Sequence, residues 1–422
     1  MTFTDMWAAI EPIGRDRRTG GYHRFAWSDA DLAMRDWFEE AARHRGLAVE
    51  TDRNGNLWAW WGDPSATDVL AVGSHLDSVP DGGAFDGPLG VVSAFTAVDN
   101  LRAAGCAPHR PVAVVAFADE EGARFGVACA GSRLLTGALD ADRARALRDA
   151  EGTTLDEAVR RAGHDSRHLG AEPERLARLG GYVELHVEQG RGLVDLGEPI
   201  AVGEAIWPHG RWRLELTGEA NHAGTTRLAD RRDPMISYAH AVLAARAEAE
   251  RRGVLATIGK VHVEPGGVNA IPSAVTAWLD ARGADEALVR EVVAAVAAEG
   301  KASLVEESWT PPTTFDPMLR DRVAAAVARA AGGGAPHPGE STGPDGPAGH
   351  VPRLPTGAGH DAGILAGAGV PAAMLFVRNP TGVSHSPAEH AEPEDCQAGV
   401  DALTAVVEDL ACRRRAHPAR PS

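Results

Sequence analysis

The chain has 422 residues, of which 44% are hydrophobic and 24% are charged, an ordinary composition for a soluble globular protein with room for two domains. Its formal net charge of −17 argues against nucleic acid or an anionic membrane surface as a partner. A small anionic substrate is still compatible with this charge, since a site can be locally positive.

The N-terminal segment and the cysteines indicate the cellular compartment. Residues 1–18, MTFTDMWAAIEPIGRDRR, lack the basic segment and apolar run of a signal peptide. No apolar stretch approaches the roughly 20 residues that span a bilayer. The four cysteines are far apart and form no CxxC pair: Cys106, Cys129, Cys396 and Cys412. We therefore expect a cytoplasmic protein with neither a disulfide framework nor a thiolate metal site.

The first predicted helix has clear end signals. Ser28 is a good N-cap, Asp31 stands three residues further on, and Gly46 ends the apolar periodicity. Residues 47–62, LAVETDRNGNLWAWWG, predict a β-hairpin that turns at Asn54-Gly55.

The next part of the chain alternates apolar runs with helical stretches. The runs are DVLAVGSHLD at 68–77, PVAVVAFADEE at 111–121 and YVELHVEQG at 182–190. A helix is predicted at 91–105, VVSAFTAVDNLRAAG. Continuous apolar strands alternating with helices predict an α/β fold whose strands are buried on both faces of the sheet.

From about residue 205 the pattern changes and indicates a second domain. Residues 211–220, RWRLELTGEA, alternate apolar and polar side chains like a half-exposed strand. The segments after it predict a helix, two strands, a helix and a strand, at 233–253, 255–264, 274–282, 284–300 and 302–309. The order β-α-β-β-α-β is that of a ferredoxin-like unit. We predict a smaller domain at 205–315, inserted into a first domain made of 1–204 and 316–422.

The α/β pattern returns in the last part of the chain. A helix is predicted at 316–332 and a strand at 371–378, PAAMLFVR. Between them, residues 332–350 are dense in glycine and proline and predict a flexible surface loop, in which His337 and His350 are solvated.

Residues capable of chemistry follow the ends of the predicted α/β strands. His75 and Asp77 stand after the first apolar run, where an α/β sheet presents its ligand-binding edge. Asp86 lies in a glycine-rich loop further on, and alone each of these could be an ordinary loop residue. Glu120 and Glu121 follow a strand, so their side chains can point to opposite sides. One could then bind a cation while the other handles a proton, although a solvated acidic turn is the simpler alternative.

Two further histidines extend this set. His186 lies in an apolar strand with Glu184 and Glu188 on its own side, a pattern that a hydrogen-bonded core histidine would also explain. His385 stands in GVSHSPAEH, after the strand at 371–378. Imidazole and carboxylate groups without thiolates suit catalytic zinc, manganese or a similar ion. Five such ligands favour two ions held together by a bridging carboxylate.

In this order the motifs resemble those of the dinuclear-metal amidohydrolases that are related to the aminoacylase and carboxypeptidase-type metallopeptidases. The resemblance is greatest to the branch of allantoate amidohydrolases, N-carbamoyl-L-amino-acid hydrolases and β-ureidopropionases. The matching segments span nearly the whole chain: GGYHRFAWSDAD, GSHLDSVPDGGAFDGPLGV, FADEEGARFGVACAGSR, ELHVEQG, NHAGTT with RRDP, GGVNAIPSAV with LDAR, PTGAGHDA and GVSHSPAE.

The resemblance implies a role for each matching residue at the metal site. The implied metal ligands are His75, Asp86, Glu121, His186 and His385. Asp86 would bridge two ions, and Asp77 would orient His75. Glu120 would be the general base that takes a proton from the attacking water and returns it to the leaving nitrogen.

The resemblance also implies substrate contacts. His222 in NHAGTT would polarise the scissile carbonyl and stabilise its oxyanion, and Asn269 and Arg282 would clamp a substrate carboxylate. The other implied contacts are Gln189, His209, Gly357 and His360. His209 departs from the pattern, since the relatives often carry glutamine there.

As a whole, the resemblance implies a metallopeptidase-like α/β catalytic domain with a central mixed sheet flanked by helices, and an inserted ferredoxin-like satellite domain that makes a homodimer. Two divalent ions per subunit are expected, Zn²⁺ or Mn²⁺, with Co²⁺ or Ni²⁺ as alternatives. Hydrolysis of a ureido or amidino C–N bond in a small carboxylate is the implied reaction, with allantoate as the first substrate. N-carbamoyl-L-amino acids are the alternative, followed by N-formyl and N-formimidoyl amino acids. A peptidase and a catalytically inactive binding protein on the same fold are the remaining hypotheses.

Overall fold

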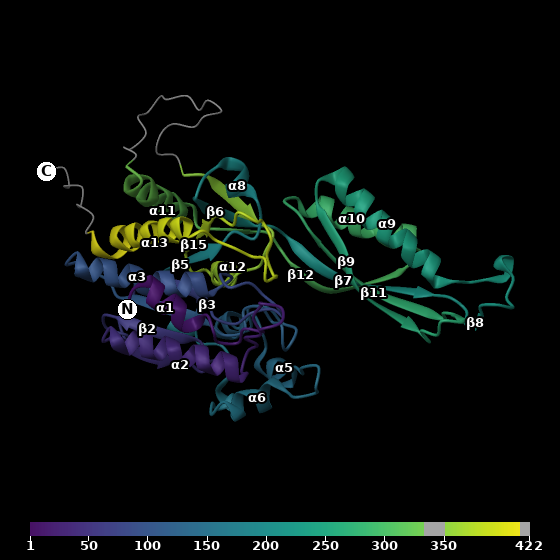
Figure 1. The fold of residues 1–422 in the computed structure, drawn as a ribbon, viewed down its shortest axis with the longest axis horizontal. Helices are drawn as coiled ribbons and strands as arrows, with labels where there is room; N and C mark the ends of the chain where they lie inside the picture. The colour runs from purple at the N-terminus through teal and green to yellow at the C-terminus, as the bar shows by residue number, and fades with distance from the viewer. Residues whose placement is uncertain (333–350, 414–422) are drawn as a thin grey trace, which may run out of the picture. The chain divides into compact units, whose positions relative to one another are not determined.

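The computed structural model describes residues 1–332 and 351–413, so the predicted loop at 332–350 lies almost wholly outside the described residues. The chain divides into two compact units (Figure 1). The first comprises Met1–Glu204, Thr314–Leu354 and Gly359–Ser422, and the second comprises Ala205–Thr313 and Pro355–Ala358.

The first unit is built on a mixed sheet with the strand order β1-β2-β4-β3-β5-β15-β6-β13, in which β14 also pairs with β6. Its strands are β1 Ala48–Thr51, β2 Leu57–Trp61, β3 Val69–His75, β4 Val112–Phe117, β5 Leu179–Val187, β6 Ile200–Ile206, β13 Thr313–Thr314, β14 Arg353–Thr356 and β15 Ala372–Val377. The central strands β4, β3, β5 and β15 run parallel, whereas β2 and β6 pair with their neighbours in the antiparallel direction. The mixed sheet confirms the predicted fold class.

The helices of the first unit are α1 Phe3–Ile10, α2 Asp29–His44, α3 Pro88–Ala103, α4 Ala130–Thr136, α5 Ala141–Ala146, α6 Leu155–Arg161, α7 Pro173–Leu176, α8 Gly192–Leu196, α11 Pro317–Ala330, α12 Asp361–Gly367 and α13 Pro393–Val407, with short helical turns at Ser166–His168 and Glu408–Cys412. As predicted, Ser28 caps α2 by accepting a hydrogen bond from the Asp31 amide. Phe38 of α2 packs on Phe95 of α3 with ring centroids 5.1 Å apart, and both belong to the main hydrophobic core.

The second unit contains the predicted β-α-β-β-α-β elements. Its strands β7 His209–Thr217, β9 Leu255–Glu264, β11 Ala274–Arg282 and β12 Ser303–Thr310 form an antiparallel sheet in the order β12-β7-β11-β9. Helices α9 Pro234–Arg252 and α10 Glu286–Gly300 pack against this sheet through an Ala- and Val-rich core. A small ladder joins β8 Asn221–His222 to β10 Ala270–Ile271, and a short turn of helix covers Leu228–Asp230.

The second unit also includes a segment that the sequence placed in the first domain. Pro355–Ala358 belongs to it, because the Trp207 amide donates to the Thr356 carbonyl at 2.8 Å and Arg282 Nη1 donates to the Gly357 carbonyl at 2.8 Å. Such contacts join segments far apart in sequence, which periodicity cannot reveal.

The prediction that the chain contains no disulfide is wrong for one pair. Cys106 and Cys412 form a disulfide with their Cα atoms 6.1 Å apart, although they are separated by 306 residues. Helices α3 and α13 pack against each other, so the loop after α3 meets the end of the helical segment after α13, where the His109 amide donates to the Ala411 carbonyl at 2.7 Å. Cys129 and Cys396 are buried thiols.

Among the described residues, none of the helices combines the length and the apolar character that crossing a membrane requires.

Candidate metal centre

The parallel strands bring the predicted metal ligands to one edge of the sheet. β3 lies between β4 and β5 and runs parallel to both. His75 at the end of β3 is paired in register with Phe117 at the end of β4, so the acidic segment after Phe117 begins next to His75. His186 is near the end of β5. The carboxyl ends of these strands therefore form the expected ligand-binding edge.

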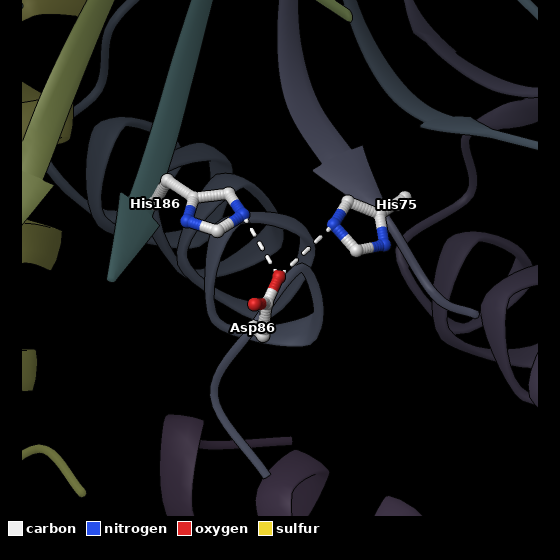
Figure 2. A group of neighbouring side chains, drawn as sticks. All are labelled: His75, Asp86 and His186. Carbon is white, nitrogen blue, oxygen red and sulfur yellow. Dashed lines mark ion pairs between the residues drawn. The ribbon is translucent and has the colours of Figure 1, made fainter. Parts of the chain in front are cut away.

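His75, Asp86 and His186 form the first cluster, and all three are buried (Figure 2). Asp86 Oδ1 lies 3.4 Å from His75 Nε2 and 3.1 Å from His186 Nε2. His186 Nδ1 is 2.8 Å from the Val187 carbonyl, to which it can only donate a hydrogen bond, so a neutral ring carries a lone pair on Nε2. His75 Nδ1 faces the Asp77 carbonyl at 3.2 Å in the same way.

The donor set of this cluster fits a cation. The Nε2 atoms of His75 and His186 are buried, and neither has a hydrogen-bond partner among the described residues. Two nitrogen lone pairs and a carboxylate oxygen that converge in a buried space repel one another unless a positive charge lies among them. This is the arrangement expected of metal-ligating histidines whose second nitrogen is held by a carbonyl.

Asp86, Glu121 and His385 form the second cluster. His385 Nε2 lies 3.4 Å from Glu121 Oε2 and 3.6 Å from Asp86 Oδ2. Asp86 is therefore shared, with Oδ1 facing the first cluster and Oδ2 facing the second. Gln189 also reaches this point, where its Nε2 donates to Asp86 Oδ2 at 2.8 Å. His385 is half exposed, which leaves the second cluster open to solvent on one side.

Several buried carboxyl groups lie around these clusters. Burial raises the pKa of Glu120 well above its usual range, against the opposing effect of His75. Burial also raises the pKa of Glu121, with Asp86 adding to the effect. For Asp86, burial acts in the same direction, but the neighbouring histidines outweigh it and hold its pKa well below the usual range. Bound cations would offset the electrostatic repulsion within such a group of buried carboxylates.

Asp77 connects His75 to the acidic segment. Its carboxylate lies 3.5 Å from His75 Nδ1. The same carboxylate accepts the backbone N–H groups of Glu120 and Glu121, each at 3.1 Å. The sequence did not predict these two hydrogen bonds, because they depend on how the ends of β3 and β4 lie side by side.

Glu120 is held between a thiol and a histidine. Cys129 Sγ donates to Glu120 Oε1 at 3.4 Å. Glu120 Oε2 lies 3.8 Å from His75 Nε2. The neighbouring Asp119 is buried, and neither of its carboxylate oxygens has a hydrogen-bond partner among the described residues.

His360 packs against His186 of the first cluster. It precedes α12, and its ring centroid is 4.5 Å from that of His186 in an edge-on arrangement. Burial lowers the pKa of His360 well below its usual range, so the ring is neutral. Neither of its nitrogens has a hydrogen-bond partner in the described part of the chain.

The remaining predicted residues belong to the second unit and form two groups. His209 and Arg282 are direct neighbours on β7 and β11, and Arg282 Nη1 donates to the Gly357 carbonyl. Arg282 also makes a two-point contact with Asp280, from Nε at 2.8 Å and from Nη2 at 2.7 Å. His222 ends β8 and Asn269 directly precedes β10, and the Ala223 amide donates to the Asn269 carbonyl.

Sequence reasoning missed several residues that touch predicted site residues. Cys129 contacts Glu120, Asp280 pairs with Arg282, and Glu389 accepts the Asp86 amide. Asp280 had a local signal, because it stands two positions before Arg282 on the same strand and therefore on the same face. The other two contacts depend on tertiary structure.

Residues 71–409 match the model of the peptidase family M20/M25/M40, and the chain therefore belongs to this family. It is 37% identical over 416 residues to the N-carbamoyl-L-amino acid amidohydrolase of Geobacillus stearothermophilus, covering 96% of this chain and 98% of that protein. It is 31% identical over 405 residues to the allantoate amidohydrolase of Escherichia coli strain K12, covering 94% of each. A crystal structure of a hydantoinase/carbamoylase family amidase from Burkholderia vietnamiensis matches with a TM-score of 0.82 and 28% identity over 97% of each chain. These similarities confirm the predicted family resemblance.

Proposed function

We propose that the protein is a metal-dependent hydrolase that cleaves the ureido C–N bond of a small carboxylate substrate. The observation that carries the proposal is the pair of histidine and carboxylate clusters that share Asp86, with the Glu120 carboxylate beside them. Similarity over nearly the whole chain to an N-carbamoyl-L-amino acid amidohydrolase and to an allantoate amidohydrolase supports the bond type.

Two substrates are supported. Allantoate is the first substrate implied by the sequence, and the relative from E. coli supports it. N-carbamoyl-L-amino acids are favoured by the higher identity to the relative from G. stearothermophilus, 37% against 31%. Both contain a ureido group and a carboxylate, so the same side chains can act on either substrate.

Two divalent ions per subunit fit the site. His75, Asp86 and His186 would hold one ion, and Asp86, Glu121 and His385 would hold the other. The nitrogen and oxygen donors suit Zn²⁺ or Mn²⁺, and Co²⁺ or Ni²⁺ as alternatives. When bound, such ions polarise a carbonyl and lower the pKa of water.

Glu120 is the proposed general base. Its carboxylate takes a proton from the attacking water, whose oxygen bonds to the ureido carbon, and it delivers the proton to the leaving nitrogen as the C–N bond breaks. Burial raises the pKa of Glu120, so its carboxyl group holds a proton more readily than an exposed glutamate does. The Cys129 thiol holds one of its oxygens, and Asp77 holds the backbone of Glu120 and orients His75.

His222 is proposed to stabilise the oxyanion. Its Nδ1 accepts the Gly224 amide at 3.0 Å. A neutral ring with an occupied Nδ1 acceptor carries its proton on Nε2, which is then available to donate to a developing negative charge.

Arg282 is proposed to bind the substrate carboxylate, together with Asn269. Asp280 and Gly357 occupy three of the five guanidinium N–H groups. One N–H remains on each Nη, which is the pair needed to hold a carboxylate at two points. Asp280 also fixes the plane of the guanidinium before substrate binds. We assign further substrate contacts to Gln189, His209, Gly357 and His360.

The protein is proposed to form a homodimer through its second unit. Strand β9 is at an edge of the four-stranded sheet and exposes Leu255 and Val261. Helix α9 exposes Ile236 and Leu243. An open strand edge beside exposed apolar side chains is typical of a surface that another chain covers. A cytoplasmic location stays a prediction from the sequence.

A substrate panel tests the function. The purified protein is loaded with Mn²⁺ or Zn²⁺ and offered allantoate and N-carbamoyl, N-formyl and N-formimidoyl L-amino acids, with dipeptides as the control class. We expect ammonia from a ureido substrate, and the comparison of the rates on allantoate and on N-carbamoyl-L-amino acids identifies the preferred one. Turnover of dipeptides as fast as that of ureido acids, or the absence of bound divalent metal, would contradict the proposal.

A further inference from the structure

Glu389 joins two loops that carry proposed metal ligands. It stands four residues after His385, and it is only 5% exposed. Its carboxylate does not point to solvent but reaches the loop that leads into Asp86, which is separated from it by 303 residues. The structure gives this buried carboxylate three donors and no cation partner among the described residues.

The two oxygens of Glu389 have separate tasks. Oε1 accepts two backbone N–H groups, those of Phe85 and Asp86, both at 3.0 Å. Oε2 accepts the Ser384 hydroxyl at 3.1 Å, and the same hydroxyl lies 3.3 Å from Asp86 Oδ2. One oxygen therefore fixes the backbone of Asp86, and the other fixes the residue next to His385.

The loop before Asp86 is closely fitted to Glu389. A Cβ atom at Gly83 would overlap both the carboxylate and the side-chain stem of Glu389, so glycine is the residue that permits the approach. The Glu389 amide is itself bound to the Ser386 carbonyl at 3.0 Å, which fixes the turn from which the side chain starts.

We propose that Glu389 is a positioning residue of the metal centre, which holds the Asp86 and His385 loops in the geometry that binds two ions. This inference rests on the proposed function, because it takes Asp86 and His385 as ligands. Glu389 itself belongs to neither ligand cluster. Without it, two buried amides and a hydroxyl lose their acceptor, and Asp86 loses its fixed backbone.

Three substitutions separate geometry from charge. Glu389→Gln removes the charge but keeps the length, so its Oε1 can still accept both amides while its Nε2 donates to Ser384, whose hydroxyl then donates to Asp86. Glu389→Asp keeps the charge but is shorter by one methylene group and cannot reach both amides. Glu389→Ala removes the acceptor entirely. Glu394→Ala, at an exposed glutamate of the same segment, is the control.

The main measurement is the binding of Mn²⁺ and Zn²⁺ to metal-free protein by competition with a chromophoric chelator. We expect the Asp and Ala variants to bind about 10- to 100-fold more weakly, as is usual when a partner of a metal ligand is removed. The Gln variant and the control should stay close to the unmodified protein. Hydrogen exchange at the amides of Phe85 and Asp86 should become faster in the Asp and Ala variants alone.

The outcomes discriminate clearly. Metal binding by the Asp variant that equals that of the Gln variant would overturn the proposal, as would a Gln variant as weak as the Ala variant. Thermal unfolding of each variant checks the fold, and if the Ala variant does not fold, the comparison of Gln with Asp decides. Metal binding is measured without substrate, so a protein that binds two ions but cleaves no ureido acid would refute the proposed function and leave this inference standing.

Discussion

Replacing Glu120 by glutamine removes the proposed general base and leaves its surroundings almost unchanged. The amide oxygen could still accept the Cys129 thiol that now lies 3.4 Å from Oε1, and the backbone of residue 120 would still donate to Asp77. Neither ligand cluster includes Glu120, so the metal content should not change. General-base catalysis contributes about 10²- to 10⁴-fold, so we expect kcat to fall by that factor. This corresponds to about 3 to 5 kcal/mol of lost transition-state stabilisation.

The same substitution should stabilise the metal-free protein. Burial raises the pKa of Glu120 above its ordinary value of 4.5, so the folded state favours the protonated form. As the pH rises above 4.5, the unfolded chain loses this proton first, and the folded protein loses stability until the pH passes the folded-state pKa. Glutamine does not titrate. Metal-free Glu120→Gln should therefore melt at a higher temperature than metal-free unmodified protein near neutral pH, and the difference should disappear below the unfolded-state pKa.

The assay measures the rate of ammonia release at a saturating substrate concentration. The metal content of the same preparations is measured by elemental analysis. Glu394→Gln, at an exposed glutamate, is the matched control and should retain full activity. A Glu120→Gln variant that keeps more than about a tenth of the original kcat would refute the general-base role, because the expected loss is at least 10²-fold. A variant that loses both activity and metal would instead make Glu120 a ligand.

Four further outcomes are expected. Arg282→Ala should raise KM for carboxylate substrates by about 10- to 100-fold with a smaller change in kcat, since a charge-assisted hydrogen bond contributes about 1.5–3 kcal/mol. Arg282→Lys should not restore binding, because lysine lacks the two-point fork of the guanidinium group. An unchanged KM would reject this assignment. His222→Ala should lower kcat by about 10²- to 10³-fold, the usual effect of losing an oxyanion donor, whereas equal kcat in the variant would remove His222 from the mechanism. Dialysis against a chelator should abolish turnover, and added Mn²⁺ or Zn²⁺ should restore it; activity that survives complete metal removal contradicts the metal centre. Cys106→Ser should lower the free energy of unfolding by about 2–4 kcal/mol, and a reductant should lower the melting temperature of the unmodified protein but not of the variant.

Local signals in the sequence were sufficient for most secondary-structure elements. The cap at Ser28, the Asn54-Gly55 turn and the apolar runs of β3, β4 and β5 each depend on interactions within a few residues. Helical and strand periodicity reports which side of an element is buried, and this holds whatever the partner is. The candidate ligands could be identified before their distances were known, because an α/β sheet binds its ligands at the carboxyl ends of its strands.

Contacts between distant segments needed the tertiary structure. The Cys106–Cys412 disulfide spans 306 residues, and the two Asp86 contacts to Ser384 and Glu389 span 298 and 303. Nothing in a local pattern distinguishes Glu389 from the other glutamates of its segment, because its burial and its donors come from a loop near the other end of the chain.

By itself, then, the sequence determined the kinds of elements, the family resemblance and which residues carry imidazole or carboxylate groups at strand ends. Only the tertiary structure decided that Asp86 belongs to both ligand clusters. It also decided that Cys129 and Asp77 hold Glu120. The contacts of Arg282 with Asp280 and Gly357 likewise depend on it. The physical reason is that periodicity and capping act over a few residues, whereas ligand geometry is set by side chains that meet only after the sheet has formed and the loops have packed on it.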